Sequence, residues 1–312
     1  MKLHIFDWLD SKERKREQNE DALKVIHAIE KKHIPFSLSC FASNCNLSIR
    51  KADKIVKRLI SLGYFSDNEK KLTGEGRAYA LKIIRRHRLY EKYLSEHSGF
   101  KPTEWHEEAC RKEHHISDYE QDKLSAKLGH PLFDPHGDPI PDDKGAVAEV
   151  HAHTIDSFEA GDVVRVVQVE DQPIELFNTL QEIGLLPGSA FKIEEMQGNE
   201  IRIIFEGELH SLSLDAANNL KLQLCTDCTE IEEMGELHKL TTLKQGEEAT
   251  IAGISSACKG VARRRLLDLG FVKGSRISID LTSPMGNPIA YVVRGTAIAL
   301  RKDQSRYILI RR

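Results

Sequence analysis

The nine residues HEEACRKEH, His106 to His114, bring imidazoles, a thiol and carboxylates together in one short stretch. On a helix of 3.6 residues per turn, positions i, i+4, i+7 and i+8 share one face. These positions are His106, Cys110, Glu113 and His114. Such donors together suit a divalent first-row transition ion rather than calcium or magnesium. The stretch therefore predicts a metal-binding helix face, with an ordinary solvated face as the alternative.

The composition narrows the class of protein. With 312 residues and 40% hydrophobic content, the chain is long enough for two to four modules. No apolar run reaches membrane-spanning length and the N-terminus becomes charged almost at once, so we expect a cytoplasmic protein without a membrane segment. Six unevenly spaced cysteines do not form a disulfide framework, and Cys40, Cys45 and Cys258 are expected to be small buried side chains.

Charge is distributed unevenly along the chain. Residues 48–88 contain twelve Lys or Arg against four Asp or Glu, whereas residues 102–143 contain four against eleven. A local basic field is what a module that binds a polyanion requires. The formal net charge of −3 therefore says little about possible partners.

The basic region has the element order of a winged helix-turn-helix. Helical patterns at 19–32, near 38–42 and at 48–63 precede a hairpin pattern at 64–73 and a further helix at about 76–94. In this motif the second helix of the turn enters the major groove and charged wing residues reach the backbone. The predicted DNA contacts are Ser48, Arg50, Lys51, Lys54, Lys57, Lys70 and Lys71. A basic helix that is merely solvated is the alternative.

The second half of the chain repeats itself. A segment rich in Pro, Gly and Asp at 130–145 predicts a linker, after which Leu180–Ile193 matches Leu266–Ile279 with two glycines in register. Strand patterns flank both segments, so we expect two copies of one small β-barrel-like domain. Cys225 and Cys228 between the copies form a lone C-x-x-C, which we interpret as linker thiols rather than a metal or redox site.

Further donors precede the first motif. His87 and Glu91 stand four residues apart on the preceding predicted helix, and Asp21 lies near the start of the first. The strings NEDALKVIHAI, RRHRLYEKYL, WHEEACRKEHHISDYEQDKL and PHGDPIP follow in that order. In these motifs, residues 18–145 resemble the diphtheria-toxin-repressor family of metal-dependent transcriptional repressors. The two C-terminal repeats look like the SH3-like domains of that family and of ferrous-iron-transport A proteins.

The resemblance implies roles for individual residues. It implies a primary ion held by Asp21, Cys110, Glu113 and His114, and an ancillary ion held by His87, Glu91 and His106. In the family the first SH3-like domain can add a Glu and a Gln, but alignment on Gly188 puts Pro173 and Leu176 there, which leaves Glu175 or Gln172 as substitutes. Iron-type members usually carry Met where Asp21 stands and manganese-type members carry Asp, while Cys110 is iron-like. The resemblance therefore implies Fe²⁺ or Mn²⁺ as the metal, with two ions per subunit.

The complete prediction is an α+β multidomain chain. Its parts are an N-terminal extension (1–17), a winged helix-turn-helix (18–82), a helical metal-binding and dimerisation domain (83–145) and two small SH3-like β-barrels (155–225 and 237–312). We expect a homodimer that binds double-stranded operator DNA, represses metal-homeostasis genes when loaded with metal, and is not an enzyme. Two alternatives stay open: a regulatory module of an iron transporter, and a zinc hydrolase, which the lack of an H-E-x-x-H pair disfavours.

Overall fold

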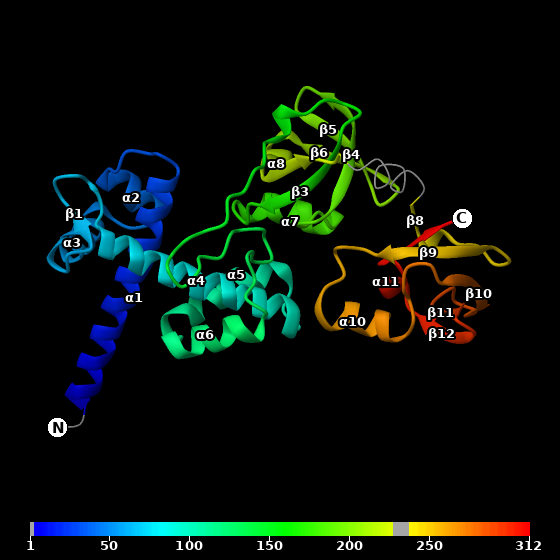
Figure 1. The fold of residues 1–312 in the computed structure, drawn as a ribbon, viewed down its shortest axis with the longest axis horizontal. Coiled ribbons are helices and arrows are strands. Elements are labelled where there is room, and N and C mark those ends of the chain that lie inside the picture. Colours follow the sequence, from blue (N-terminus) through cyan, green and yellow to red (C-terminus); the bar gives the residue numbers. More distant parts are fainter. Residues whose placement is uncertain (1–2, 227–236) are drawn as a thin grey trace. The chain divides into compact units, whose positions relative to one another are not determined.

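The computed structural model describes residues 3–226 and 237–312 (Figure 1). The chain divides into two compact units. The first unit comprises the chain up to Glu91 together with residues 106–134 and 139–148. The second comprises residues 92–105, residues 135–138 and the chain from Glu149 onward.

The first unit begins with a winged helix-turn-helix. Its elements are α1 (Leu3–Lys31), α2 (Leu38–Asn44), α3 (Ile49–Ser61), β1 (Phe65–Ser66), β2 (Lys71–Leu72) and α4 (Gly74–His97). The elements α5 (Pro102–Lys112), η1 (Glu113–His115, a 3-10 turn) and α6 (Asp118–Lys127) follow. The strands β1 and β2 pair antiparallel as the expected hairpin. The element order predicted from the sequence is confirmed.

The sequence explains where α3 begins and ends. The Ser48 side chain accepts a hydrogen bond from the Lys51 amide, which satisfies one of the free donors at the helix N-terminus. Gly63 follows the helix with φ +77°, a conformation that costs glycine little. Four α3 side chains face the core: Ala52, Ile55, Val56 and Leu59. They pack with Leu23, Ile26 and Phe41 from the two preceding helices, and this core fixes α3 against α1.

One expectation about helices is wrong. The stretch HEEACRKEH is not a single helix, since α5 ends at Lys112 and Glu113 opens η1. Beyond the stretch, Ser117 caps α6 in a capping box with Glu120 and has an extended backbone. This cap separates η1 from α6, so no helix runs from α5 into α6. The predicted extension 1–17 leads into the first expected helix without a break, because α1 runs from Leu3 to Lys31.

The second unit contains two antiparallel sheets. The first sheet is built from β3 (Val163–Val169), β4 (Ala190–Gln197), β5 (Glu200–Phe205), β6 (Glu208–Ser213) and β7 (Leu220–Leu224), with η2 (Ile155–Ser157), α7 (Ile174–Ile183) and α8 (Leu214–Asn218). The second is built from β8 (His238–Lys239), β9 (Glu248–Ile254), β10 (Arg276–Thr282), β11 (Ile289–Val293), β12 (Thr296–Leu300) and β13 (Ile308–Arg311), with η3 (Leu240–Thr242), α10 (Gly260–Asp268) and α11 (Lys302–Ser305).

The strand orders confirm the internal repeat. They are β6-β5-β4-β3-β7 in the first sheet and β12-β11-β10-β9-β13-β8 in the second, so five strands follow the same order. Gly184 and Gly270, which match in the sequence repeat, have φ of +97° and +94°. Each follows a helix and turns the chain toward the next strand, and this conformation explains why both copies carry glycine.

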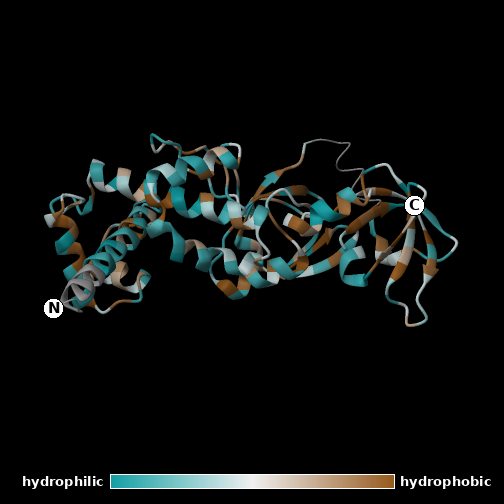
Figure 2. Ribbon diagram, turned by 90° about the horizontal axis from the view of Figure 1, so that it is seen from below, coloured by the Kyte–Doolittle hydropathy of each residue, from teal (hydrophilic) through white to brown (hydrophobic). Residues whose placement is uncertain are grey.

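Hydropathy follows this division of elements. In Figure 2 several strands are largely brown, the hydrophobic colour, whereas the coloured part of the long N-terminal helix is mainly teal, the hydrophilic colour. Cys258 is buried as expected, while Cys40 and Cys45 are only partly buried. The expected C-x-x-C pair ends at Cys228, which lies outside the described residues.

The core that positions α3 can be tested by truncation. Leu59 is fully buried, so Leu59→Ala should destabilise the protein by about 2–5 kcal/mol through reduced burial and a residual cavity. Leu62, at the end of the same helix, is 47% exposed, and Leu62→Ala should change stability by less than about 1 kcal/mol. Urea unfolding of both variants checks this. Equal losses of stability would show that α3 is not held by this core.

Candidate metal centre

The predicted ligand His114 lies against α1. Its Nδ1 atom is 2.6 Å from Oε2 of Glu20, and its Nε2 atom is 3.3 Å from Oδ1 of Asp21. Glu20 also accepts a hydrogen bond from the Tyr79 hydroxyl, and its side chain is 2% exposed. A carboxylate on one imidazole nitrogen fixes the ring and directs the other nitrogen. Glu20 therefore orients His114 so that its Nε2 atom faces Asp21.

Glu113 is the centre of the cluster. Its carboxylate is completely buried and contacts two basic groups from different helices. Lys24 Nζ of α1 lies 2.7 Å from Oε1 and 2.8 Å from Oε2, and His87 Nδ1 of α4 lies 2.6 Å from Oε2. The Nε2 atom of His114 is 3.6 Å from Oε1. Because an unpaired buried carboxylate is costly, these contacts hold α1, α4 and η1 together.

A second set of donors adjoins the first. His87 Nε2 is 3.0 Å from Oε1 of Glu91, and His106 Nδ1 is 3.5 Å from the same oxygen. The thiol sulfur of Cys110 is 3.5 Å from His106 Nε2 and 4.0 Å from His87 Nδ1. Cys110 therefore lies with two of the predicted ancillary ligands.

Hydrogen bonds and charges within the site shift the pKa values of two proposed ligands, His114 and Cys110. Burial alone would lower the pKa of His114, but hydrogen bonds to Asp21 and Glu20 raise it to about 10. Burial opposes the Cys110 thiolate, yet hydrogen bonds with His106 and His87 and the charge of Lys24 lower the pKa of Cys110 to about 6. A thiolate is the form that ligates metal.

The structure brings together most of the predicted ligands. Donor atoms of Asp21, Glu113 and His114 lie within 4.8 Å of one another, and so do those of His87, His106 and Cys110. Both sets contain the imidazole, carboxylate or thiolate donors that divalent transition ions prefer, and Glu113 is buried, so the residues fit such an ion. Glu175, at the start of α7, belongs to the second unit, and its part in the ancillary set remains a prediction.

Two residues of the cluster were missed by the sequence analysis. Glu20 precedes Asp21, and Lys24 lies one helical turn further along α1. Their spacing could have placed both on the α1 face that carries Asp21, because residues three and four apart share a face. A lysine, however, is not a metal donor at neutral pH, so a search for ligands passes over it.

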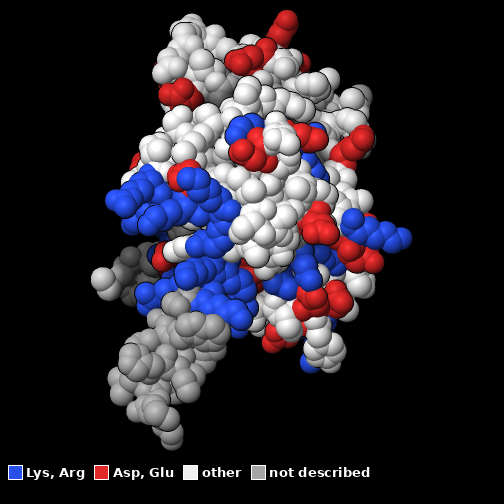
Figure 3. Space-filling model, turned by 90° about the vertical axis from the view of Figure 1, so that its left-hand side faces the viewer, with Lys and Arg blue, Asp and Glu red and all other residues white. Residues whose placement is uncertain are grey.

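The predicted DNA contacts form a surface around α3 and the β1–β2 hairpin. All seven side chains are exposed: Ser48, Arg50, Lys51, Lys54, Lys57, Lys70 and Lys71. Lys57 and Lys70 form ion pairs with nearby Asp side chains, whereas Arg50 and Lys54 form no ion pair with any of the described residues. Figure 3 shows the face of the molecule that carries these elements, and Lys and Arg side chains gather over part of this face.

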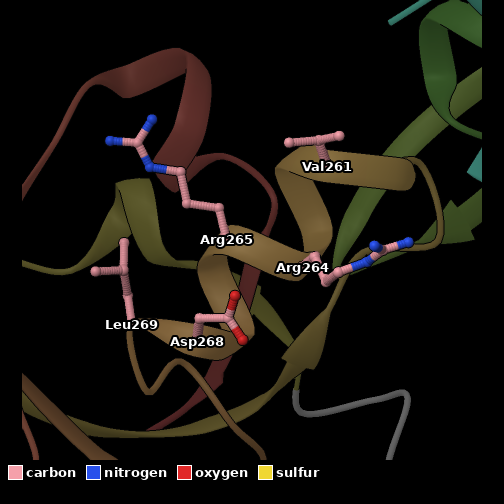
Figure 4. A pocket seen from close by; sticks show the side chains of 5 residues that line it. All are labelled: Val261, Arg264, Arg265, Asp268 and Leu269. Atoms are coloured by element: carbon pink, nitrogen blue, oxygen red, sulfur yellow. The ribbon is translucent and has the colours of Figure 1, made fainter. Parts of the chain in front are cut away.

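A shallow pocket of about 290 Å³ lies on α10 in the second unit. It is lined by Val261, Arg264, Arg265, Asp268 and Leu269 (Figure 4). The two arginines extend in opposite directions, and the lining offers a single carboxylate as a metal donor. This pocket therefore lacks the set of three donors that the first unit brings together at Asp21, Glu113 and His114.

Comparison with known proteins identifies the family. Residues 73–142 match the family model for the iron dependent repressor, metal binding and dimerisation domain, and residues 238–312 match the FeoA domain. The iron-dependent repressor IdeR of Mycobacterium leprae is 32% identical over 166 residues, which cover 49% of this chain and 72% of that protein. This chain belongs to the iron-dependent repressor family. The diphtheria toxin repressor of Corynebacterium efficiens is 31% identical over 169 residues, covering 50% of this chain and 72% of that protein.

The solved structures agree with this family. A manganese-dependent transcriptional repressor in complex with manganese aligns with a TM-score of 0.61 and 29% identity. The alignment covers 66% of this chain and 99% of that chain. The repressor family model thus accounts for residues 73–142, and the FeoA model for residues 238–312. Among the described residues, no helix is both long and apolar enough to cross a membrane.

The Glu20–His114 contact predicts how the stability of the metal-free protein depends on pH. The pKa of His114 is raised in the folded protein from 6.5 to about 10, so its protonation stabilises the metal-free fold below pH 6.5 and this contribution disappears as the pH approaches 10. Glu20→Gln should therefore lower the pKa of His114. It should also reduce the free energy of unfolding more at pH 6.5 than at pH 10.

Histidine NMR titration and urea unfolding in the presence of a chelator measure both quantities. Glu17→Gln is the matched control, because Glu17 contacts His115 instead. An unchanged pKa of His114 in Glu20→Gln would show that Glu20 does not control this imidazole.

Proposed function

We propose that this protein is a metal-activated repressor that binds double-stranded operator DNA as a homodimer and controls genes of metal-ion homeostasis. In this proposal Fe²⁺ or Mn²⁺ is held by Asp21, Cys110, Glu113 and His114, and a second ion by His87, Glu91 and His106. The names of its relatives, which describe iron-dependent and manganese-dependent repressors, support this function. Those relatives are not enzymes by name, which argues against the zinc-hydrolase alternative.

One observation carries the proposal: the candidate ligands come from both sides of a structural junction. Asp21 lies on α1, which packs into the winged-helix core, whereas Glu113 and His114 lie on η1, within the matched metal-binding and dimerisation segment. A bound ion would supply positive charge and directional bonds at this junction. Asp21 and His114 would then fix α1 relative to η1, and only a difference in metal affinity between two arrangements can shift their populations.

The proposed operator contacts follow from exposure and charge. Arg50 and Lys54 lie on the solvent face of α3, one turn apart, while its opposite face is buried in the core. A helix presented in this way can enter the major groove, and a dimer presents two such helices to half-sites about one helical turn apart. The dimer is proposed from the matched family segment, which is described as a dimerisation domain.

The C-terminal repeats are proposed to be SH3-like β-barrels. Their support is the shared strand order and the FeoA match of the second copy. That match also favours the second candidate function, in which the repeats regulate iron transport. A salt-dependent complex with promoter DNA distinguishes the repressor, because a module acting only on a transporter has no use for it.

The ligand assignment predicts a loss of metal response. His114→Ala should remove metal-activated operator binding, because the variant lacks one donor of the primary set and the junction is no longer bridged. His115→Ala is the control, since His115 is a neighbouring imidazole that contacts Glu13 and Glu17. Fluorescence anisotropy of an operator duplex, titrated with Mn²⁺, measures the response. If His114→Ala still gains operator affinity on adding Mn²⁺, the assignment is wrong.

The DNA surface predicts a change in salt dependence. Removing the partner of one DNA phosphate should reduce the slope of log K against log salt by about 0.9. Arg50→Ala combined with Lys54→Ala should therefore weaken operator binding and reduce the slope by up to about two units. Lys123→Ala, an exposed lysine on α6, should leave the slope unchanged. Unchanged affinity and sequence preference in the double variant would place the DNA-binding surface elsewhere.

A further inference from the structure

Lys24 is a positively charged side chain inside a cluster that is expected to bind positive ions. It lies on α1, and its ammonium contacts both carboxylate oxygens of Glu113, at 2.7 and 2.8 Å. The Lys24 side chain is 20% exposed, and the Glu113 side chain is fully buried. The negative charges of Glu113, Cys110 and Asp21 raise the pKa of Lys24 against the effect of its burial. A proposed primary ligand, Glu113, is thus in direct contact with a cation that the chain itself supplies.

We propose that Lys24 competes with the regulatory ion for Glu113. In the metal-free protein its ammonium binds the Glu113 carboxylate, and this contact raises the metal concentration needed to fill the site. This inference rests on the proposed function, because it assigns Glu113 to that site. It adds a residue that sets the threshold of the metal response without being a ligand.

The hydrogen-bond capacity of Glu113 supports the competition. An ionised carboxylate offers about four lone-pair sites. Lys24 uses one on each oxygen, and His87 uses a further one on Oε2. A metal ion that binds both oxygens must therefore displace the ammonium. An ion that binds one oxygen would lie a few ångströms from a like charge, and at that distance in a partly buried site the repulsion is substantial.

The position of Lys24 on α1 makes the competition unavoidable. Lys24 follows Asp21 by three residues, so both project from one side of the helix. Leu23, between them, is fully buried in the winged-helix core and anchors this turn. Any arrangement of α1 that brings Asp21 to Glu113 and His114 therefore also brings Lys24 there. The ammonium can leave only by rotating its own side chain.

The ion pair between Lys24 and Glu113 also stabilises the metal-free protein. Without Lys24, Glu113 would keep His87 as its remaining basic partner at hydrogen-bond distance among the described residues. Removing one partner of a buried ion pair is strongly destabilising, because the other charge stays buried. The same substitution should therefore weaken the metal-free fold and strengthen metal binding. A lysine that only supports the fold would give the first effect alone.

The test measures Mn²⁺ binding to the full-length protein by isothermal titration calorimetry after chelator treatment. Lys24→Met removes the charge and keeps much of the aliphatic length, and Lys24→Gln is a second variant that keeps a polar end. Both should bind Mn²⁺ at least about ten-fold more tightly than the wild type. Their melting temperature in chelator should be lower, and the increase on adding Mn²⁺ should be larger.

Two controls isolate the charge at this position. Lys24→Arg keeps a cation, so its Mn²⁺ affinity should stay within about three-fold of the wild type. Lys82→Met removes a lysine from another ion pair of the first unit, with Asp118, and should leave Mn²⁺ affinity unchanged. Unchanged or weaker Mn²⁺ binding in both Lys24→Met and Lys24→Gln overturns the proposal.

Failure of the proposed function looks different. If Lys24→Met binds Mn²⁺ more tightly but Mn²⁺ activates operator binding in neither protein, Lys24 is a competitor and the repressor proposal fails. If His114→Ala binds Mn²⁺ as well as the wild type does, the ion is held elsewhere and the Lys24 proposal falls with the site.

Discussion

The first unit depends on one buried charge, the carboxylate of Glu113. A carboxylate removed from water needs compensating partners, and here they come from two different helices, α1 and α4. Lys24 and His87 are therefore structural partners of Glu113 as well as neighbours of the proposed ions. The junction between the winged-helix core and the following helices is held by electrostatics rather than by apolar packing alone.

This arrangement explains why so many pKa values in the site are displaced together. His114 lies between Glu20 and Asp21, and Cys110 lies between two imidazoles. Each group stabilises the charged form of its neighbour, so the cluster holds thiolate, carboxylate and imidazolium at once. Before an ion can bind through imidazole, protons must leave it, so metal binding and proton release are linked. In the metal-free site, protonated imidazoles and the Lys24 ammonium thus supply positive charge to the carboxylates.

Much of the fold could be read from the sequence because its signals are local. Ser48 and Gly63 define α3 by capping and by positive φ, and the matched glycines of the two repeats mark equivalent turns. The grouping of Asp21 with Glu113 and His114 was reached differently, through resemblance to a family, since no local pattern connects residues so far apart. The single helix expected over HEEACRKEH was wrong, because the spacing of the donors does not show that the α-helix ends at Lys112 and gives way to a 3-10 turn.

Glu20 and Lys24 were missed in the sequence for the same physical reason. Each contacts a residue about ninety positions away, His114 or Glu113, so no local pattern shows the contact. A search for metal-donor side chains also selects ligands and passes over a residue that orients a ligand or competes with the ion. Cys110 shows the same limit, since its spacing from Glu113 suggested one shared ion, whereas the 3-10 turn after Lys112 changes the direction in which the following side chains project. Glu113 contacts Lys24 of α1 and His87 of α4, whereas Cys110 contacts His106 and the same nitrogen of His87. The two proposed donor sets thus share the Nδ1 atom of His87, and a change in the contacts of one set must reach the other through this imidazole.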